Sequence, residues 1–572
     1  MLMKYYFCAV LNQMCKNLME QGYQFIDYIE QSIIGNWDRD ALTDYKGVTF
    51  QYKDVARKIA KFHIVLESTG IRPGDKIAVC GRNSANWAVS FLATMTYGAV
   101  IVPILHEFKA DNIHNIVNHS EAKILLVGDQ IWENLNEDCM PLLEGIVSLA
   151  DFSPLILRNE QLSYALDHLN EIYGQRYPKN FRPEHIRYRK DRPEELAIIN
   201  YTSGTTGYSK GVMLPYRSIW SNVAYCHEMR RVNPGDHIVS MLPLGHVFGM
   251  VYDFLYGFSA GAHIYFLTRM PSPKIIAQSF AEIKPKLISC VPLIVEKIIK
   301  KDILPKVDGK IGKLLLKVPI VNDRLKASAR QAAMEIFGGN FDEIIIGGAP
   351  FNGEVEMFLK KIGFPYTIAY GMTECGPIIC SSRWDMLKTA SCGKAASRME
   401  VRIDSPDPRN QAGEIVCKGI NLMLGYYKNP EATAQIIDTD GWLHTGDLAT
   451  MDEEGYITVR GRSKNLLLTS AGQNIYPEEI ESKLNNLPFV AESLVVLQHD
   501  KLIALIYPDF EEAFAQGLQQ ADIEKAIEEN RVELNRQLPG YNQIAKVKIH
   551  FEEFEKTAKK SIKRFMYQEV KE

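Results

Sequence analysis

Residues 201–212 read YTSGTTGYSKGV and follow a short apolar run. Glycines, hydroxyl side chains and one lysine are concentrated between Ser203 and Lys210. Glycines let backbone N–H groups turn towards an anion, hydroxyls donate further hydrogen bonds, and the lysine adds positive charge. This composition is typical of a polyphosphate-binding loop, with a solvated hairpin as the alternative. The Walker A loop ends in Gly-Lys-Ser/Thr before a helix. Here Ser209 precedes the lysine and 212–214 is expected to be a strand, so the loop is of another kind.

Length and composition indicate a multidomain globular protein. A chain of 572 residues is too long to fold around a single hydrophobic core. Its contents of 46% apolar and 23% charged residues are ordinary for globular proteins. The net charge of -4 gives no reason to expect nucleic acid as a partner. Ten cysteines without a CxxC pair favour reduced thiols over a disulfide framework, and we expect Cys375 and Cys380 to be buried packing residues. Neither a transmembrane helix nor a signal peptide is predicted.

The first third alternates between helical and strand patterns, which predicts parallel sheets covered by helices. Apolar spacing and turn residues predict helices over 54–67, 84–97 and 111–119, and strands over 76–80 and 122–127. We assign no catalytic role to this region.

The middle third contains MLPLGHVFGM at 241–250, in which His246 stands in a glycine-flanked turn. The apolar and aromatic run over 251–267 is expected either to line a tunnel or to fill a core, because periodicity cannot separate these arrangements. Asp253 is the only acid in the run, and it keeps open an amino-acid substrate whose ammonium would need a carboxylate.

Three later motifs have residue types suited to a nucleotide. FDEIIIGGAPF at 341–351 predicts a buried strand followed by small residues against which a flat ring can lie. AYGMTE at 369–374 supplies a carboxylate that suits a hard cation. GWLHTGDL at 441–448 supplies Asp447, which is either an acceptor for the ribose hydroxyls or an Asx-turn residue. GYITVRGR at 455–462 supplies Arg462.

Together, and in this order, these motifs resemble those of the adenylate-forming (AMP-binding) superfamily, which includes acyl-CoA synthetases, aryl-CoA ligases, peptide-synthetase adenylation domains and luciferases. The resemblance covers nearly the whole chain and implies ATP, Mg²⁺ and CoA as cofactors. It implies that the phosphates are bound by Thr202, Ser203, Gly204, Thr205, Thr206, Gly207 and Lys210. The implied magnesium ligands are Thr206 and Glu374.

The resemblance also implies roles for the later motifs. The residues approaching adenine are Gly348, Ala349, Pro350, Tyr370 and Gly371, with Tyr370 stacking on the ring. Thr373 would hold the α-phosphate, and Asp447 and Arg462 the ribose. His246 would lie beside the acyl substrate and gate its pocket. The implied catalytic residues are Glu374, His246 and Lys560.

The fold class implied is α/β, with a large N-terminal domain of helix-covered parallel-type sheets plus a β subdomain, and a small mobile α+β C-terminal domain. We expect the large domain over 1–460, a hinge over 461–464 and the small domain over 465–572. Strands over 493–497 and 502–507 and a helix over 523–537 are expected in the small domain. By resemblance this domain rotates about Lys464 between adenylation and thioester formation, and Gly472 lets the pantetheine arm pass.

One segment departs from the family pattern. The family ends in Lys-Thr-x-x-Gly-Lys, whereas residues 554–565 read FEKTAKKSIKRF and place Ser561 where the last lysine belongs. Either Lys560 fills this role through a shifted loop, or adenylation is impaired; we favour Lys560.

The interpretation is an ATP-dependent acyl-CoA synthetase for a medium- to long-chain fatty acid. A basic, helical insert over 300–338 resembles one in long-chain acyl-CoA synthetases. The alternatives are an acyl-AMP ligase that loads an acyl carrier protein, an aryl- or amino-acid-adenylating enzyme, and a non-catalytic nucleotide-binding relative. A cytoplasmic location is expected, and the basic insert keeps open peripheral contact at the inner face of the membrane.

Overall fold

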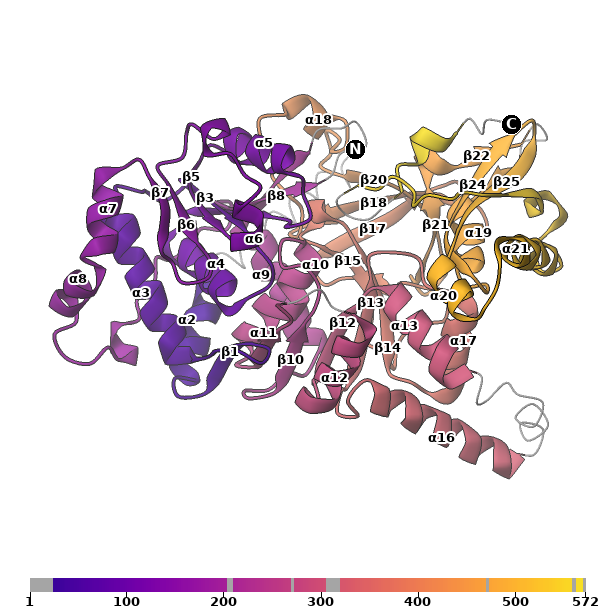
Figure 1. Cartoon of the computed structure of the whole chain (residues 1–572), viewed down its shortest axis with the longest axis horizontal. Coiled ribbons are helices and arrows are strands. Elements are labelled where there is room, and N and C mark those ends of the chain that lie inside the picture. Colours follow the sequence, from indigo (N-terminus) through magenta and orange to yellow (C-terminus); the bar gives the residue numbers. More distant parts are fainter. Residues whose placement is uncertain are drawn as a thin grey trace, which may run out of the picture.

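Two large sheets whose central strands run parallel form the body of the protein (Figure 1). The structure is a computed structural model that describes residues 24–202, 209–268, 272–304, 319–469, 473–557 and 562–568. One sheet runs, in spatial order, through β16 (Lys394–Ala395), β15 (Ile378–Ser381), β14 (Tyr366–Gly371), β13 (Glu343–Gly347), β12 (Leu287–Cys290), β10 (His237–Ser240), β11 (His263–Phe266), β1 (Asp40–Asp44) and β2 (Thr49–Gln51).

The second large sheet carries the strands that flank the predicted phosphate loop. Its spatial order is β19 (Gly425–Tyr426), β9 (Lys210–Pro215), β8 (Leu196–Thr202), β4 (Val100–Ile104), β3 (Lys76–Cys80), β5 (Ala122–Val127), β6 (Gly145–Ser148) and β7 (Pro154–Leu157). The strands predicted over 76–80 and 122–127 are therefore confirmed, as is the parallel pairing.

Helices cover both sheets, as the alternating pattern predicts. Those of the large domain are α2 (Phe25–Gly35), α3 (Tyr52–Ser68), α4 (Ala85–Tyr97), α5 (Ala110–Ser120), α6 (Asp129–Trp132), α7 (Glu160–Asp167), α8 (Leu169–Arg176), α9 (Tyr216–Met229), α10 (Val247–Gly249), α11 (Tyr256–Ser259), α12 (Pro273–Ile283), α13 (Pro292–Ile298), α16 (Pro319–Ile336), α17 (Gly353–Ile362) and α18 (Pro430–Ala434). The three helices predicted in the first third are confirmed to within two residues at each end.

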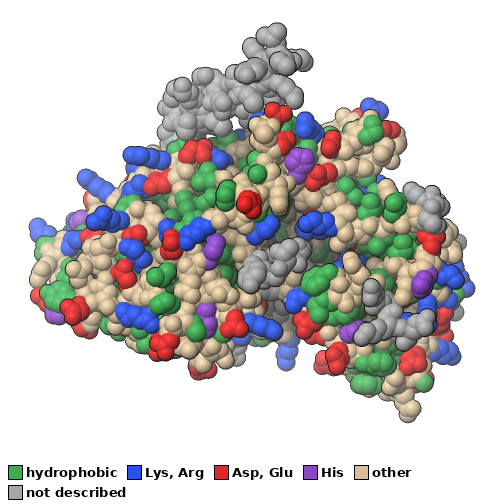
Figure 2. All heavy atoms as spheres, turned by 90° about the horizontal axis from the view of Figure 1, so that it is seen from above, with side chains coloured by type: hydrophobic (Ala, Val, Ile, Leu, Met, Phe, Trp, Pro, Cys, Tyr) green, Lys and Arg blue, Asp and Glu red, His purple; other side chains and the backbone are tan. Residues whose placement is uncertain are grey.

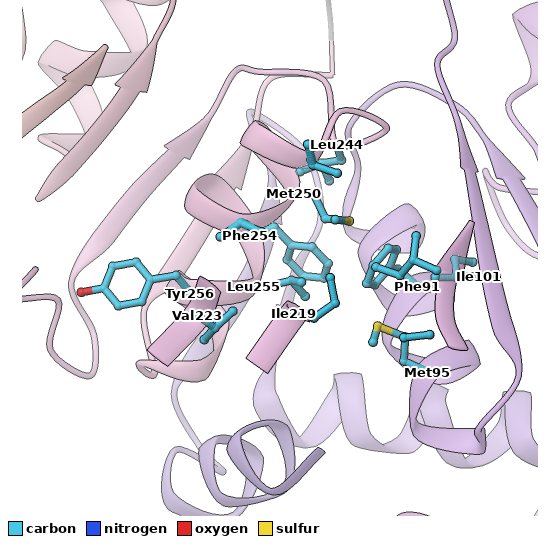
Figure 3. Packing of buried hydrophobic residues seen from close by; sticks show 14 of the residues in the cluster. Phe91, Met95, Ile101, Ile219, Val223, Leu244, Met250, Phe254, Leu255 and Tyr256 are labelled. Atoms are coloured by element: carbon cyan, nitrogen blue, oxygen red, sulfur yellow. The ribbon is translucent and has the colours of Figure 1, made fainter. Parts of the chain in front are cut away.

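The core between the sheets is organised around α4. This helix begins where the Ser84 hydroxyl accepts a hydrogen bond from the Trp87 N–H, and nearly all of its residues are buried. A π-helical turn over Met250–Leu255 packs beside it, with the Phe91 and Phe254 rings 5.7 Å apart and edge-on (Figure 3). Most of the apolar run over 251–267 is buried and contributes to the core, which was one of its two predicted arrangements.

A β subdomain and a small α+β domain follow. The subdomain sheet has the order β17 (Met399–Asp404), β18 (Gly413–Gly419), β20 (Leu443–Met451) and β21 (Ile457–Arg462). The small domain contains a sheet of β24 (Val490–Gln498), β25 (Lys501–Pro508) and β26 (Ile544–Ile549), the ribbon β22 (Leu467–Leu468) and β23 (Asn474–Ile475), and helices α19 (Pro477–Leu484), α20 (Phe510–Ala515) and α21 (Gln520–Asn535). Its predicted strands and helix are all present.

Surface charges of both signs are interspersed on the face seen in Figure 2. Across the described residues, no helix combines the length and apolar character needed to cross a bilayer. Cys375 and Cys380 are fully buried, as predicted.

Candidate active site

The two ends of the predicted phosphate loop are held by an antiparallel pair of strands. β8 and β9 pair so that Thr202 lies opposite Lys210. The intervening Ser203, Gly204, Thr205, Thr206 and Gly207 lie outside the described residues. The pairing brings both ends of the loop together at the same end of these two strands.

The predicted magnesium carboxylate and the phosphate-loop lysine meet at one tyrosine. The Tyr426 hydroxyl donates a hydrogen bond of 2.7 Å to Glu374 Oε1, and the Lys210 Nζ lies 4.9 Å from the centre of the Tyr426 ring. Tyr426 and Glu374 are only 6% and 8% exposed, so this hydrogen bond is shielded from water. Tyr426 thus joins two motifs that are 164 residues apart in the chain, a role absent from the sequence predictions. In the sequence, Tyr426 is only the first of two tyrosines after Gly425, and this pattern by itself does not indicate a functional role.

A tight turn positions Glu374. The acid lies in a single 3₁₀ turn over Thr373–Cys375 that follows β14. The chain then folds back so that the Met372 N–H donates to the Pro377 carbonyl at 3.0 Å. A Cβ at Gly371 would lie 2.0 Å from that carbonyl oxygen, so only glycine fits there.

A second cluster forms around Asp447, the residue predicted to accept hydrogen bonds from a ribose. Asp447 on β20 is in register with Arg462 on β21, and their side chains form an ion pair of 3.1 Å. The Tyr370 hydroxyl donates to the other Asp447 oxygen at 2.7 Å. Burial raises the pKa of Asp447, and the Arg462 guanidinium and the Tyr370 hydroxyl oppose that rise. Glu374 also raises the pKa of Asp447, so the two clusters act on each other electrostatically.

The predicted adenine loop lies at the end of β13. Gly348, Ala349 and Pro350 are exposed, and Gly348 has a φ of +90° with no heavy atom within 4 Å of the position of a Cβ. A left-handed backbone with open space above it is compatible with a flat ring lying on the peptide planes.

His246 lies at the start of α10, where its Nδ1 accepts a hydrogen bond of 3.2 Å from the Phe248 N–H. Asn200 of β8 donates to the Gly245 carbonyl at 2.9 Å. On the other side, a Cβ at Gly347 would lie 3.2 Å from the Phe248 ring. The motif therefore lies between β8, which precedes the predicted phosphate loop, and β13, which precedes the predicted adenine loop.

Asp253 holds two backbone N–H groups in the core. It is fully buried, and one of its oxygens accepts the Met241 and Leu242 N–H groups at 3.2 Å each. Burial raises its pKa to about 8. The carboxyl group therefore joins the π-turn to the end of β10, which gives it a structural role.

The residues present suit a magnesium ion with few protein ligands. Glu374 uses one carboxylate oxygen, Oε1, to accept the hydrogen bond from the Tyr426 hydroxyl. Within the described ranges there is no group of three or more His, Cys, Asp or Glu side chains that could hold a metal. Mg²⁺ commonly takes one or two carboxylates and completes its shell with water and phosphate oxygens. Thr206, Gly472 and Lys560 lie outside the described residues.

Comparison with known proteins shows the family and the fold. The family profile described as AMP-binding enzyme matches residues 29–427, and that described as AMP-binding enzyme C-terminal domain matches 464–570. The long-chain-fatty-acid–CoA ligase ACSBG1 of Rattus norvegicus is 26% identical over 493 residues, 80% of this chain and 66% of that protein, just under two thirds of its length. Long-chain-fatty-acid–CoA ligase 5 of the same organism is 26% identical over 564 residues, 89% of this chain and 80% of that protein.

Among solved structures, the anthranilate CoA ligase AuaEII in complex with anthranoyl-AMP superimposes with a TM-score of 0.74 at 19% identity, covering 96% of each chain. The fold is thus shared with this CoA ligase. The chain belongs to the AMP-binding enzyme family.

Proposed function

We propose that the chain is an AMP-forming acid–CoA ligase that activates a medium- to long-chain fatty acid. The observation that carries the proposal is the convergence of Lys210, Glu374 and Asp447 through Tyr426 and Tyr370 at one site. The relatives named above, long-chain-fatty-acid–CoA ligases, support the choice of acid and thiol.

In the proposed first step, the fatty-acid carboxylate attacks the α-phosphorus of ATP and pyrophosphate leaves. Lys210 and the phosphate loop would bind the triphosphate, Thr373 the α-phosphate, and Asp447 with Arg462 the ribose hydroxyls. Glu374 and Thr206 would hold Mg²⁺, which supplies charge neutralisation of the phosphates. These groups accelerate the step by position and electrostatics.

In the proposed second step, the CoA thiol attacks the acyl carbonyl and AMP leaves. Lys560 would act in the first step, and Gly472 would lie beside the pantetheine arm in the second, after the small domain turns about the 461–464 hinge. We further propose a cytoplasmic location with peripheral contact at the inner face of the membrane, where long acyl substrates reside.

The test is AMP formation from ATP with saturated fatty acids of increasing length, aryl acids and amino acids, each with and without CoA. AMP together with acyl-CoA from fatty acids supports the proposal and reports the preferred chain length. AMP formation from fatty acids that does not depend on CoA would indicate that the acyl acceptor is a carrier protein and not CoA. No AMP with any acid would contradict the proposal and favour a non-catalytic nucleotide binder.

A further inference from the structure

The small domain is held against the large domain by a cluster of polar contacts away from the nucleotide site. Glu296 and Lys300 lie one turn apart on α13 and the π-turn over Ile299–Ile303 that extends it. Lys300 Nζ donates a hydrogen bond of 2.9 Å to the backbone carbonyl of Asn486, just beyond α19. The Asn486 side-chain amide donates to Glu296 Oε2 at 3.3 Å. In Figure 1 the small domain lies beside α13 and α17.

The same cluster includes the residue that starts α17. The Asn352 N–H donates to Glu296 Oε1 at 2.8 Å, and the Asn352 amide group donates to the Ser482 carbonyl at 3.3 Å. Asn352 Oδ1 also caps α17 through two backbone N–H groups. Glu296 and Asn352 are 6% and 2% exposed, so these hydrogen bonds are largely protected from water. Asn352 follows the adenine loop by two residues, which connects the domain contact to the nucleotide site.

Within the described residues, a further polar contact of α19 with the large domain lies at the first turn of this helix, near the hinge. Arg460 pairs there with Glu479 at 3.5 Å. Contacts this close to a pivot change little when a domain rotates, because displacement grows with distance from the axis. The contacts at the far end of α19 have to break. They therefore determine how firmly this arrangement is held.

We propose that Glu296, Lys300 and Asn352 form an interdomain latch that grips Ser482 and Asn486 and sets the balance between the docked and released positions of the small domain. The three are positioning residues, because they act on the reaction through the domain that they hold. This inference rests on the proposed function in one respect, the need for two domain positions in two partial reactions. The latch itself is defined by the contacts alone.

Lys300→Met tests the latch, since it retains an unbranched side chain but removes the charged donor. A hydrogen bond from a charged group that is partly buried is worth enough to shift an equilibrium about tenfold or more. The matched control is Lys297→Met, which removes an exposed lysine from the same helix. Lys300→Arg retains a cationic donor and should restore the docked position. If Lys300→Met does not fold, Asn486→Ala removes the contact with Glu296 from the other side.

The measurement is the distance distribution between spin labels on the exposed Cys139 and on Lys525→Cys of α21, with Cys8 and Cys15 replaced by serine. We expect one docked distance in the wild type and Lys297→Met, and a docked-to-released ratio about tenfold lower in Lys300→Met. Equal distributions in Lys300→Met and the wild type, or an equal shift in Lys297→Met, would overturn the latch.

Measuring the two partial reactions separately distinguishes a failure of the latch from a failure of the proposed function. Pyrophosphate exchange and thioester formation from a synthetic acyl adenylate should change in opposite directions in Lys300→Met, because one domain position is populated at the expense of the other. Parallel loss of both would overturn the latch. A wild type with no exchange on any acid would instead refute the proposed function, while the label distances would still decide the latch.

Discussion

The substitution Tyr426→Phe removes the hydroxyl that orients Glu374, the proposed magnesium ligand. The substitution retains the aromatic ring next to Lys210. The lost hydrogen bond is 2.7 Å long, is accepted by a carboxylate and is nearly inaccessible to water. Hydrogen bonds of this kind contribute about 1.5–3 kcal/mol, and leaving a buried oxygen unpaired adds to the cost. A loss of about 2 kcal/mol lowers kcat/KM for MgATP about thirtyfold.

The assay is pyrophosphate exchange with the best fatty acid, at several magnesium concentrations. Excess magnesium should recover part of the rate, because the defect is in holding the cation. The matched control is Tyr427→Phe, which removes the neighbouring hydroxyl that donates to Glu121 at 2.9 Å on the surface. An unchanged rate in Tyr426→Phe, or an equal fall in Tyr427→Phe, would refute a role for Tyr426 in positioning Glu374.

Three further predictions concern Asp447, Asp253 and Lys560. Asp447→Asn loses the charge that pairs with Arg462 and a ribose acceptor, so KM for ATP should rise about tenfold, measured from initial rates. Asp253 has its pKa raised by burial from 3.8 to about 8, so the native state retains a proton that the unfolded state releases. The free energy of unfolding should therefore fall across this pH range by up to about 1.4 kcal/mol per pH unit, in denaturant titrations, and Asp253→Asn should lack this fall. Lys560→Ala should slow pyrophosphate exchange by tenfold or more, about the value of one charge-assisted contact.

Each of these has an outcome that contradicts it. An unaltered KM in Asp447→Asn would remove the ribose role. Equal pH profiles for the wild type and Asp253→Asn would show that this carboxyl group keeps an ordinary pKa. For Lys560→Ala, an exchange rate equal to that of the wild type would contradict the role of the lysine, and Lys563→Ala, which removes a partner of Glu555, is the matched control.

Much of the fold follows from local pattern. The helix over 85–97 was predictable because Ser84 is a cap and Gly98 takes the left-handed conformation that ends it. The parallel strands on either side were predictable from their short apolar runs. The site residues with a family motif, such as Tyr370, Asp447 and Arg462, were predictable as a set. The structure adds the contacts between them, and their roles in nucleotide binding stay predictions.

The remainder depends on contacts between distant segments. Tyr426 joins the site because β19 adds to the edge of β9, a pairing between residues more than 200 positions apart that no local pattern contains. The buried position of Asp253 depends on how α4 packs against the π-turn, since an acid in an apolar run is equally compatible with a tunnel. The latch around Glu296 involves ordinary polar residues that acquire a role only when the domains meet.

The most direct test of the account follows an oxygen atom from the acid. A fatty acid labelled with ¹⁸O in its carboxylate should be incubated with ATP, Mg²⁺ and CoA, and the nucleotide and phosphate products analysed by mass spectrometry. Attack of the carboxylate on the α-phosphorus predicts one ¹⁸O atom in AMP and none in pyrophosphate. Label in phosphate or pyrophosphate, or acyl-CoA formed with unlabelled AMP, would contradict an acyl-adenylate intermediate at this site.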